Sequence, residues 1–428
     1  MLAACGASQP PIGAPGAMPL IAARAQPLSG SGYQVLYRFQ GDASGRMDGF
    51  DPQSDLIAVK DNLYGTTSQG GEYNYSQCGD AKFFAGCGTV FEVNTSGEER
   101  VLYRFVGDKD GYYPSAGLVA LNGTLYGTTV SGGGLFCKSG YYHSCGTVFA
   151  LSLSGQEHVL HSFSGLPDGD RPSANLIAVN GMLYGTAVGG GSVRNGCIRS
   201  GGCGVVFQVS PSGSERVLHA FRAGKDGAFP SGPLISVHGT LYGVTGGGGS
   251  AGCGTVFKVS TSGSESVLYS FSGSGDGCGP QGSLAAINGV LYGVTHWGGS
   301  ARVCHCGTVF KVSTTGTEKV IYNFQGGGDG EQPVAGVIAL DGALYGTTFG
   351  GGGGCAASLG CGTVFKISTT GVEQVLHAFK GGTDGAGPVA GLRVLLGTLY
   401  GTTAGGGDYS CGPSGSGFSC GTVFKILP

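Results

Sequence analysis

The motif Leu-Tyr-Gly occurs seven times in this chain, and this recurrence limits the fold more strongly than any other feature. Its tyrosines are spaced 50 to 62 residues apart: Tyr64, Tyr126, Tyr184, Tyr242, Tyr292, Tyr345 and Tyr400. A second motif, Asp-Gly-x-x-Pro, also occurs seven times and begins at Asp48, Asp110, Asp168, Asp226, Asp276, Asp329 and Asp384. A period of this length is typical of one supersecondary unit repeated in space. Residues 33–428 are therefore predicted to form a single repeat domain.

Each repeat contains four short β-type segments separated by turn signals. In the fourth repeat these segments are PLISVH, TLYGVT, GTVFKVS and SVLYSF, and the first two are joined at His238-Gly239, a typical hairpin turn. All connections are short enough for an antiparallel meander. Seven such units predict an all-β fold, a seven-bladed β-propeller with four antiparallel strands per blade. A solenoid is the alternative, but solenoid ends need polar caps, which the repeats lack.

The last repeat has only three of the four segments. It stops after CGTVFKILP, whereas the same motif in the other repeats leads into a fourth segment such as VLYSF. A spare fourth segment, YQVLYRF, begins at residue 33. We predict that this N-terminal strand completes the last blade and closes the ring, which removes the open edges that a sheet must otherwise protect.

Cysteine spacing predicts loop-closing disulfides. Five pairs lie six to nine residues apart, and each ends on the cysteine of a Cys-Gly-[Thr/Val]-Val-Phe motif: Cys78/Cys87, Cys137/Cys145, Cys197/Cys203, Cys355/Cys361 and Cys411/Cys420. These spacings differ from the two-to-four-residue knuckles that bind zinc, so we favour disulfides over metal. Disulfides in turn indicate an oxidising compartment.

Blades four and five depart from this pairing rule. Cys253 has no partner in its own loop, Cys304 and Cys306 are two residues apart, and Cys278 lies inside an Asp-Gly-x-x-Pro motif. We expect Cys278 to bond Cys253, with Cys304 as the alternative. The first pairing would join blade four to blade five and leave Cys304 and Cys306 either as a pair or as free thiols.

Residues 1–32 precede the repeats and are rich in proline, glycine and alanine. Leu2-Ala3-Ala4-Cys5 resembles a lipobox, in which Cys5 would be lipidated, and the remainder would be a flexible tether. No basic and apolar signal regions precede Cys5, so either the natural start lies farther upstream or the match is accidental. We expect an exported protein of the bacterial cell envelope or exterior, anchored through a lipid.

Charge and hydropathy exclude several classes of partner. Only 11% of residues are charged, the net charge is -3, and Lys and Arg form no run that would neutralise phosphates, so we expect no nucleic-acid partner. No stretch of 18 apolar residues is present, so membrane contact would come only from the lipid anchor. We expect a monomer without a cofactor.

The recurring pattern LYGTTxxGG…CGTVFKxxxxGxExVLYxFxGxxDGxxPxAGL resembles the bacterial GloVer repeat of cell-surface proteins, which carry various anchoring signals. The resemblance covers about nine tenths of the chain, and all of its motifs recur in order seven times. It implies an exported, surface-tethered protein, and it implies no particular chemistry.

Aromatic residues in the variable loops are the candidate binding residues. In an antiparallel meander these loops lie on one face of the ring, and loops on a rigid scaffold commonly carry function. Aromatic rings give a large contact area for a glycan or a protein partner. The alternative is that they only cover glycine-rich loops. The candidates are Tyr73, Tyr75, Tyr112, Tyr113, Tyr141, Tyr142, His143, His296, Trp297 and His305.

Catalytic residues are not evident. We interpret the seven Asp of Asp-Gly-x-x-Pro as turn caps rather than cation ligands, and we interpret His161, His219 and His377, which replace a strand Tyr, as packing variants. The sequence thus favours a binding or structural module, with a hydrolase or lyase on the cysteine-loop face as the alternative. Its candidate residues would be Asp170, Arg171 and Glu331.

Overall fold

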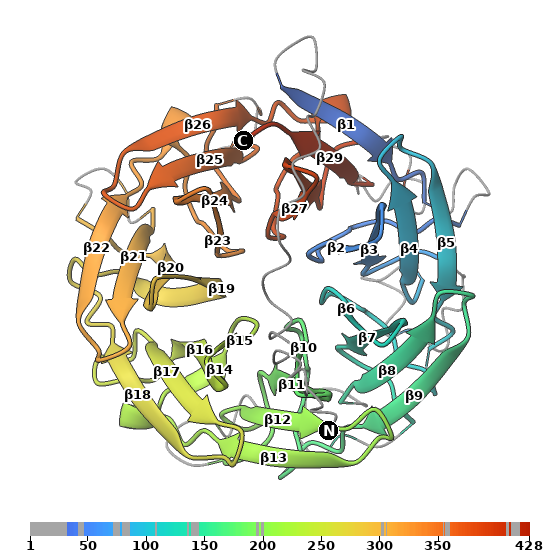
Figure 1. Cartoon of the computed structure of the whole chain (residues 1–428), viewed down its shortest axis with the longest axis horizontal. Helices are drawn as coiled ribbons and strands as arrows, with labels where there is room; N and C mark the ends of the chain where they lie inside the picture. The colour runs from blue at the N-terminus through green and yellow to red at the C-terminus, as the bar shows by residue number, and fades with distance from the viewer. Residues whose placement is uncertain are drawn as a thin grey trace, which may run out of the picture.

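The computed structural model describes residues 32–41, 47–71, 78, 86–107, 109–134, 137, 145–193, 197, 201–300, 304, 306–353, 355, 360–407, 411 and 420–428. These residues form seven antiparallel sheets arranged in a ring (Figure 1). The first strand of each blade lies nearest the centre, and the fourth lies on the outer rim. Secondary structure other than strands is confined, in the part described, to short 3₁₀ turns. The predicted seven-bladed propeller is confirmed.

The strands of the first three blades follow the predicted segments closely. Blade one contains β2 (Ile57–Val59), β3 (Asn62–Thr67), β4 (Thr89–Asn94) and β5 (Glu99–Arg104). Blade two contains β6 (Val119–Leu121), β7 (Thr124–Thr129), β8 (Thr147–Ser152) and β9 (Glu157–Ser162). Blade three contains β10 (Ile177–Val179), β11 (Met182–Ala187), β12 (Val205–Val209) and β13 (Glu215–Ala220).

Blade four has an additional short strand, because its Asp-Gly-x-x-Pro loop pairs with the end of the second strand. It contains β14 (Ala228–Pro230), β15 (Ile235–Val237), β16 (Thr240–Gly247), β17 (Thr255–Ser260) and β18 (Glu265–Ser270). In blade five the same pairing merges into one long strand: β19 (Cys278–Ile287), β20 (Val290–Trp297), β21 (Thr308–Ser313) and β22 (Glu318–Asn323).

Blades six and seven complete the ring. Blade six contains β23 (Val337–Leu340), β24 (Ala343–Thr348), β25 (Thr363–Ser368) and β26 (Glu373–Ala378). Blade seven contains β27 (Arg393–Leu395), β28 (Thr398–Thr403), β29 (Thr422–Ile426) and β1 (Tyr33–Arg38). The 3₁₀ turns η2 (Gly224–Asp226), η3 (Gly327–Asp329) and η4 (Gly382–Asp384) lie in loops between blades.

Ring closure occurs as the sequence predicts. β1 pairs antiparallel with β29, with Tyr33 opposite Ile426 and Arg38 opposite Thr422. Figure 1 shows these two strands, one from each end of the chain, side by side in the last blade. The ring therefore leaves no blade with an unpaired third strand.

Pairs of phenylalanines connect neighbouring blades. The Phe that follows each outer strand contacts, edge to face, the Phe of the third strand in the next blade, with ring centroids 5.0 to 5.4 Å apart. All of these rings are buried. The seven pairs are Phe39–Phe91, Phe105–Phe149, Phe163–Phe207, Phe221–Phe257, Phe271–Phe310, Phe324–Phe365 and Phe379–Phe424. Each pair adds aromatic packing to the area that it buries, so the core consists of seven equivalent blade junctions.

The glycine of Leu-Tyr-Gly makes room for these rings. A Cβ on Gly65 would lie 2.7 Å from Cζ of Phe91 and 2.9 Å from Cδ2 of Leu56. Real Cβ atoms do not approach carbon this closely, because cores are already packed at crystal-like density. The recurrence of Leu-Tyr-Gly therefore follows from the packing of the third-strand Phe.

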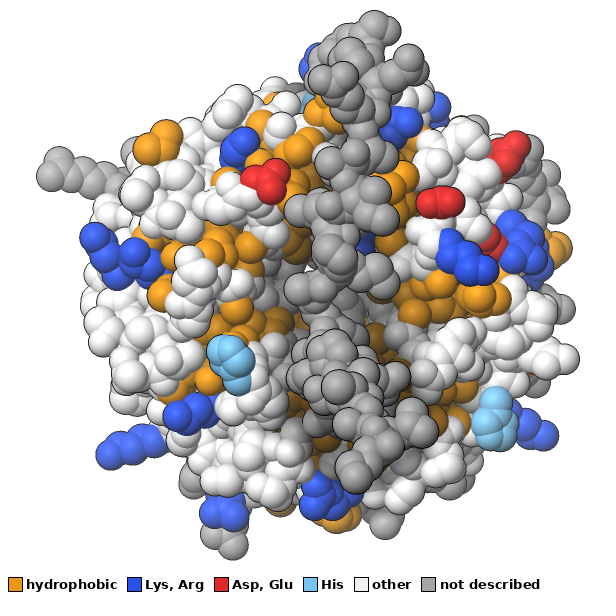
Figure 2. Space-filling view, viewed as in Figure 1, with side chains coloured by type: hydrophobic (Ala, Val, Ile, Leu, Met, Phe, Trp, Pro, Cys, Tyr) orange, Lys and Arg blue, Asp and Glu red, His pale blue; other side chains and the backbone are white. Residues whose placement is uncertain are grey.

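The two faces of the ring differ in the loops that they carry. The loops between blades contact the loops that join second and third strands, as in the hydrogen bond from Tyr113 N to Cys87 O. We call this side the cysteine-loop face. The opposite face carries the short turns. In the view of Figure 2, Lys and Arg side chains lie mostly toward the outer margin of the ring, and hydrophobic side chains lie nearer its middle.

Seven disulfides form among the described cysteines. Six are local, and the seventh joins Cys253 of blade four to Cys278 of blade five across 25 residues of sequence. The local pairs are Cys78–Cys87, Cys137–Cys145, Cys197–Cys203, Cys304–Cys306, Cys355–Cys361 and Cys411–Cys420. Of the two partners considered for Cys278, the structure has Cys253. So many disulfides indicate an oxidising, extracellular environment. Among the described residues, no helix has the length and apolarity needed to cross a membrane.

Candidate functional site

The acids of Asp-Gly-x-x-Pro close their own loops. In all seven copies the carboxylate accepts a hydrogen bond at 2.6 to 3.1 Å from a backbone N–H, which lies four residues earlier in six copies and eight residues earlier for Asp48. The donors are Gln40, Val106, Ser164, Arg222, Ser272, Gln325 and Lys380. This is the turn-capping role that the sequence predicts, and it gives each acid a structural reason to recur.

A side chain of the outer strand also binds each of these acids. Four tyrosine hydroxyls donate to the carboxylate at 2.5 to 2.8 Å: Tyr37 to Asp48, Tyr103 to Asp110, Tyr269 to Asp276 and Tyr322 to Asp329. In three blades histidine Nε2 lies 3.1 to 3.2 Å from the acid: His161–Asp168, His219–Asp226 and His377–Asp384. The histidines are therefore polar partners of the loop acid as well as packing variants of Tyr.

A glutamate from the next blade joins these acid pairs. Burial and, to a smaller extent, the nearby carboxylate of Asp110 raise the pKa of Glu157 to about 7. The pKa values of Glu215, Glu265, Glu318 and Glu373 are likewise raised to about 7, primarily by burial. The sequence alone did not lead us to this glutamate as a partner of the loop acid. It could have been found, because a Glu recurs four residues before the strand Tyr or His in each of these repeats.

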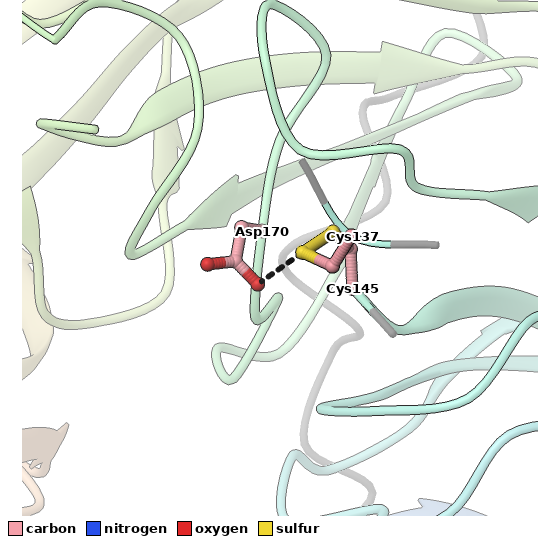
Figure 3. Close-up of side chains that lie close together, drawn as sticks. All are labelled: Cys137, Cys145 and Asp170. Carbon is pink, nitrogen blue, oxygen red and sulfur yellow. Dashed lines mark hydrogen bonds between the residues drawn. A yellow bond between two sulfur atoms is a disulfide. The ribbon is translucent and has the colours of Figure 1, made fainter. Parts of the chain in front are cut away.

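On the cysteine-loop face, the residue after Asp-Gly lies against the loop cysteine. Figure 3 shows the carboxylate of Asp170 directed at the Cys137–Cys145 disulfide, with Oδ1 3.5 Å from Sγ of Cys137. Asp170 is buried, and its Oδ2 lies 3.3 Å from Nε of Arg171. Because its charge is paired and shielded, Asp170 is poorly placed to act on a substrate.

The equivalent residue of blade six is Glu331. Its Oε2 lies 3.5 Å from Sγ of Cys306, beside the Cys304–Cys306 disulfide. The sulfurs of these two carboxylate–disulfide groups are already bonded to one another, whereas metal ions bind thiolates. Neither group can therefore act as a thiolate metal site while its disulfide is intact.

His296 and Trp297 form a stacked pair, and His296 is hydrogen-bonded to the side chain of Gln332, the residue after Glu331. Their rings are 4.0 Å apart and within 9° of parallel, and 47% of Trp297 is exposed. Burial lowers the pKa of His296, and a hydrogen bond that the imidazole donates to the Gln332 side chain partly offsets the effect. We call His296, Trp297, Glu331 and Gln332 the aromatic platform. It combines an exposed ring with a carboxylate and an amide.

The disulfide between blades four and five supports this platform. Trp297 is the last residue of β20 and lies opposite Cys278 in the pairing with β19. Cys278 is bonded in turn to Cys253, and the next residue, Gly279, lies close to the indole of Trp297. The platform is thus attached to a cross-linked strand end rather than to a loop tip.

The other predicted binding residues are separated from the platform or lie outside the described residues. Tyr112 and Tyr113 contact each other edge to face in the loop between blades one and two, and the Tyr113 hydroxyl donates to Cys78 O at 2.7 Å. Tyr113 thus covers its own cysteine loop, which fits the covering alternative. The candidates outside the described residues are Tyr73, Tyr75, Tyr141, Tyr142, His143 and His305, together with the lipidation candidate Cys5.

An acid that the sequence did not single out connects three blades through its hydrogen bonds. Asp55 accepts hydrogen bonds from the Gly391 backbone and from Nδ2 of Asn175, the latter at 2.6 Å. Asn175 Oδ1 in turn accepts from the backbone N–H of Gly117 at 2.6 Å. Burial raises the pKa of Asp55. Both of its oxygens have donors, so the geometry favours a structural role.

Comparison with protein families gives one match. Residues 24–199 and 198–414 both match the model of the Gloeobacter/Verrucomicrobia repeat. A comparison with curated protein sequences finds no match.

Several solved structures resemble this chain over most of its length. The designed protein Ika8 is 12% identical with a TM-score of 0.45, covering 92% of this chain and all of that one. A puromycin hydrolase is 13% identical with a TM-score of 0.50, covering 85% of this chain and 52% of that one. A gluconolactonase from Xanthomonas campestris is 12% identical with a TM-score of 0.37, covering 66% and 79%. At these identities the similarity concerns the fold alone.

Proposed function

Because this chain belongs to the Gloeobacter/Verrucomicrobia repeat family and folds as a disulfide-bonded propeller, we propose that it is a binding module of the bacterial cell envelope or exterior. The ligand is a glycan, and the binding surface is the aromatic platform. Lipidation of Cys5 would hold the module at the surface through the segment before residue 33.

One observation carries the proposal: the half-exposed indole of Trp297, stacked on His296 and fixed beside the cross-linked end of β19. An aromatic face held rigid offers a large apolar contact to the C–H face of a sugar ring at low entropic cost. Gln332, which is hydrogen-bonded to His296, and its chain neighbour Glu331 supply an amide and a carboxylate in the adjoining loop, and a few polar groups beside an apolar surface are typical of small-ligand sites.

The enzyme alternative uses the same face and receives less support from the contacts. Asp170 and Arg171 pair with each other, which leaves Glu331 as the accessible acid among the residues considered. Hydrolysis would need a second acid or base within reach of the same substrate. A hydrolase-like propeller among similar structures adds nothing specific, since one fold hosts many functions.

A glycan array followed by calorimetry on the best ligand tests the proposal. Trp297→Ala should weaken binding by about 30-fold, because truncating a central aromatic anchor typically costs about 2 kcal/mol. Val372→Ala is the matched control, because Val372 is 72% exposed in a turn on the opposite face. Retention of full affinity by Trp297→Ala, or binding of proteins but no glycans, would contradict the proposal. Hydrolysis of a bound glycan that Glu331→Ala abolishes would support the enzyme alternative.

A further inference from the structure

Two junctions on the outer rim bring together a histidine and two carboxylates from neighbouring blades. At the first, His219 at the end of β13 and Asp226 of the following loop meet Glu265, the first residue of β18. At the second, His161 of β9 and Asp168 meet Glu215 of β13. In each cluster one ligand atom from every residue lies within 4.8 Å of the others.

We propose that each of these two clusters binds a divalent first-row transition-metal ion, for which Zn²⁺ is the natural probe. Imidazole nitrogen together with carboxylate oxygen is a donor set that such ions accept and that Ca²⁺, which prefers oxygen alone, does not favour. Two carboxylates and a neutral imidazole would also match the charge of the ion.

The distances in the first cluster suit a small ion. His219 Nε2 lies 3.2 Å from Asp226 Oδ1 and 4.0 Å from Glu265 Oε2. Donors bound tetrahedrally at about 2.1 Å are roughly 3.4 Å apart, so shifts well below 1 Å would complete the geometry. His219 and Asp226 are 19% and 22% exposed, which leaves an open side for a water or another ligand.

Glu265 contributes a buried carboxylate to the first cluster. Its side chain is only 9% exposed, and its Oε1 is buried without a hydrogen-bond partner among the described residues. A buried carboxylate oxygen without a donor is costly, and a metal ion compensates such a group. Oε1 of Glu215 is in the same situation in the second cluster, and so is Oε1 of Glu157, Glu318 and Glu373 at junctions where tyrosine replaces the histidine. The buried oxygen is thus common to these junctions, and the histidine is what distinguishes the two proposed sites.

The other junctions explain why only two sites are expected. In four junctions the histidine is replaced by tyrosine, whose hydroxyl donates a hydrogen bond to the acid and so remains protonated: Tyr37, Tyr103, Tyr269 and Tyr322. At the third histidine, His377, the place of the glutamate is taken by Tyr33, which stacks on the imidazole at 3.6 Å. Tyrosine is therefore a variant that the repeat itself accommodates at this position.

Titration of the tag-free, metal-stripped full chain with Zn²⁺, by calorimetry under non-reducing conditions, tests the proposal. Two ions per chain are expected. His219→Tyr and His161→Tyr should each remove one, the double variant should remove both, and Tyr269→His should add a third beside Asp276 and Glu318.

Melting curves without metal show whether the variants remain folded, and loading with Zn²⁺ should raise the melting temperature of the wild type but not of the double variant. A wild type that binds no Zn²⁺ would overturn the proposal. So would a double variant that is folded and still binds two ions.

Discussion

The junction between blades six and seven differs from the other junctions in the side chain that its outer strand contributes. Elsewhere the first position of that strand is a glutamate, as in Glu157, whose raised pKa reflects burial beside a loop acid. At the closing blade it is Tyr33, which stacks on His377 and donates to Asp384 O at 2.6 Å. The blade assembled from both ends of the chain thus relies on ring stacking where the continuous blades pair two carboxyl groups.

The first position of the outer strand can thus hold either a glutamate that pairs with a loop acid or a tyrosine that stacks on a histidine. A pair of carboxyl groups is stable only when a proton is shared, so it depends on pH. Burial lowers the pKa of His377, so the imidazole that stacks on Tyr33 is neutral at the pH values at which the paired carboxyl groups lose their proton. The closing junction is therefore expected to hold under conditions that weaken the others.

The largest effect is expected from removing the closing strand. Deletion of residues 33–39 takes away β1 and buried Phe39, whose contact with Phe91 joins blade seven to blade one. Loss of one buried Phe costs about 3–5 kcal/mol, a large part of the stability of an ordinary domain. We expect the truncated chain to lose cooperative thermal unfolding, measured by circular dichroism. Gln34→Ala, at an exposed position of β1, is the control. If the melting temperature is unchanged after the deletion, the pairing of β1 with β29 does not stabilise the ring.

A smaller effect is expected from making the closing junction resemble the others. Tyr33→Glu removes ring contacts with His377, Phe379 and Phe424. Aromatic pairs contribute about 0.5–1.5 kcal/mol each, so a loss of about 1–3 kcal/mol is expected in denaturant unfolding. Gln34→Glu adds the same charge at an exposed position of the same strand. Equal stability of the two variants would show that stacking does not hold the closing blade.

The smallest effect on stability is expected from the ionisation of a single buried glutamate as the pH changes. The pKa of Glu157 is raised from 4.5 to about 7, so the folded chain retains a proton that the unfolded chain releases. Stability should therefore be highest below about pH 4.5 as far as this group is concerned, and it should decline as pH rises to about 7. Melting temperatures across this range should fall by a few degrees and then level off.

The variant Glu157→Gln tests the origin of that decline. Glutamine cannot ionise beside Asp110 and Tyr103, so the slope of melting temperature against pH should become shallower than that of the wild type. Glu98→Gln, in an exposed turn, is the matched control. A slope that is the same in all three proteins would place the pH dependence elsewhere.

Local sequence was sufficient to predict the propeller because each blade is specified by its own motifs. Leu-Tyr-Gly reports the packing of a glycine against the third-strand Phe, and the missing fourth segment of the last repeat predicts the pairing of β1 with β29. The extra strand β14 was not predicted. It depends on Ala228 and Pro230 pairing with an extended β16, which the four-segment pattern does not encode.

The candidate sites were predictable only in part. Trp297 and His296 stood out because they interrupt the repeat, but the hydrogen bond between His296 and Gln332 depends on how two blades pack. The same holds for Glu265, which meets His219 only because neighbouring outer strands overlap at the rim. Asp170 was considered as an accessible acid, and its pairing with Arg171 could be seen only in three dimensions.

The pairing of β1 with β29 also sets an order for the maturation of the chain. During synthesis β1 emerges first and its partner last, and contacts such as Tyr33 to Asp384 span 351 residues. Contacts of such long range form slowly. Until β29 is made and has crossed to the compartment where the disulfides form, β1 is an unpaired edge open to strands of other chains. We therefore expect nascent copies to need separation from one another until the ring is complete.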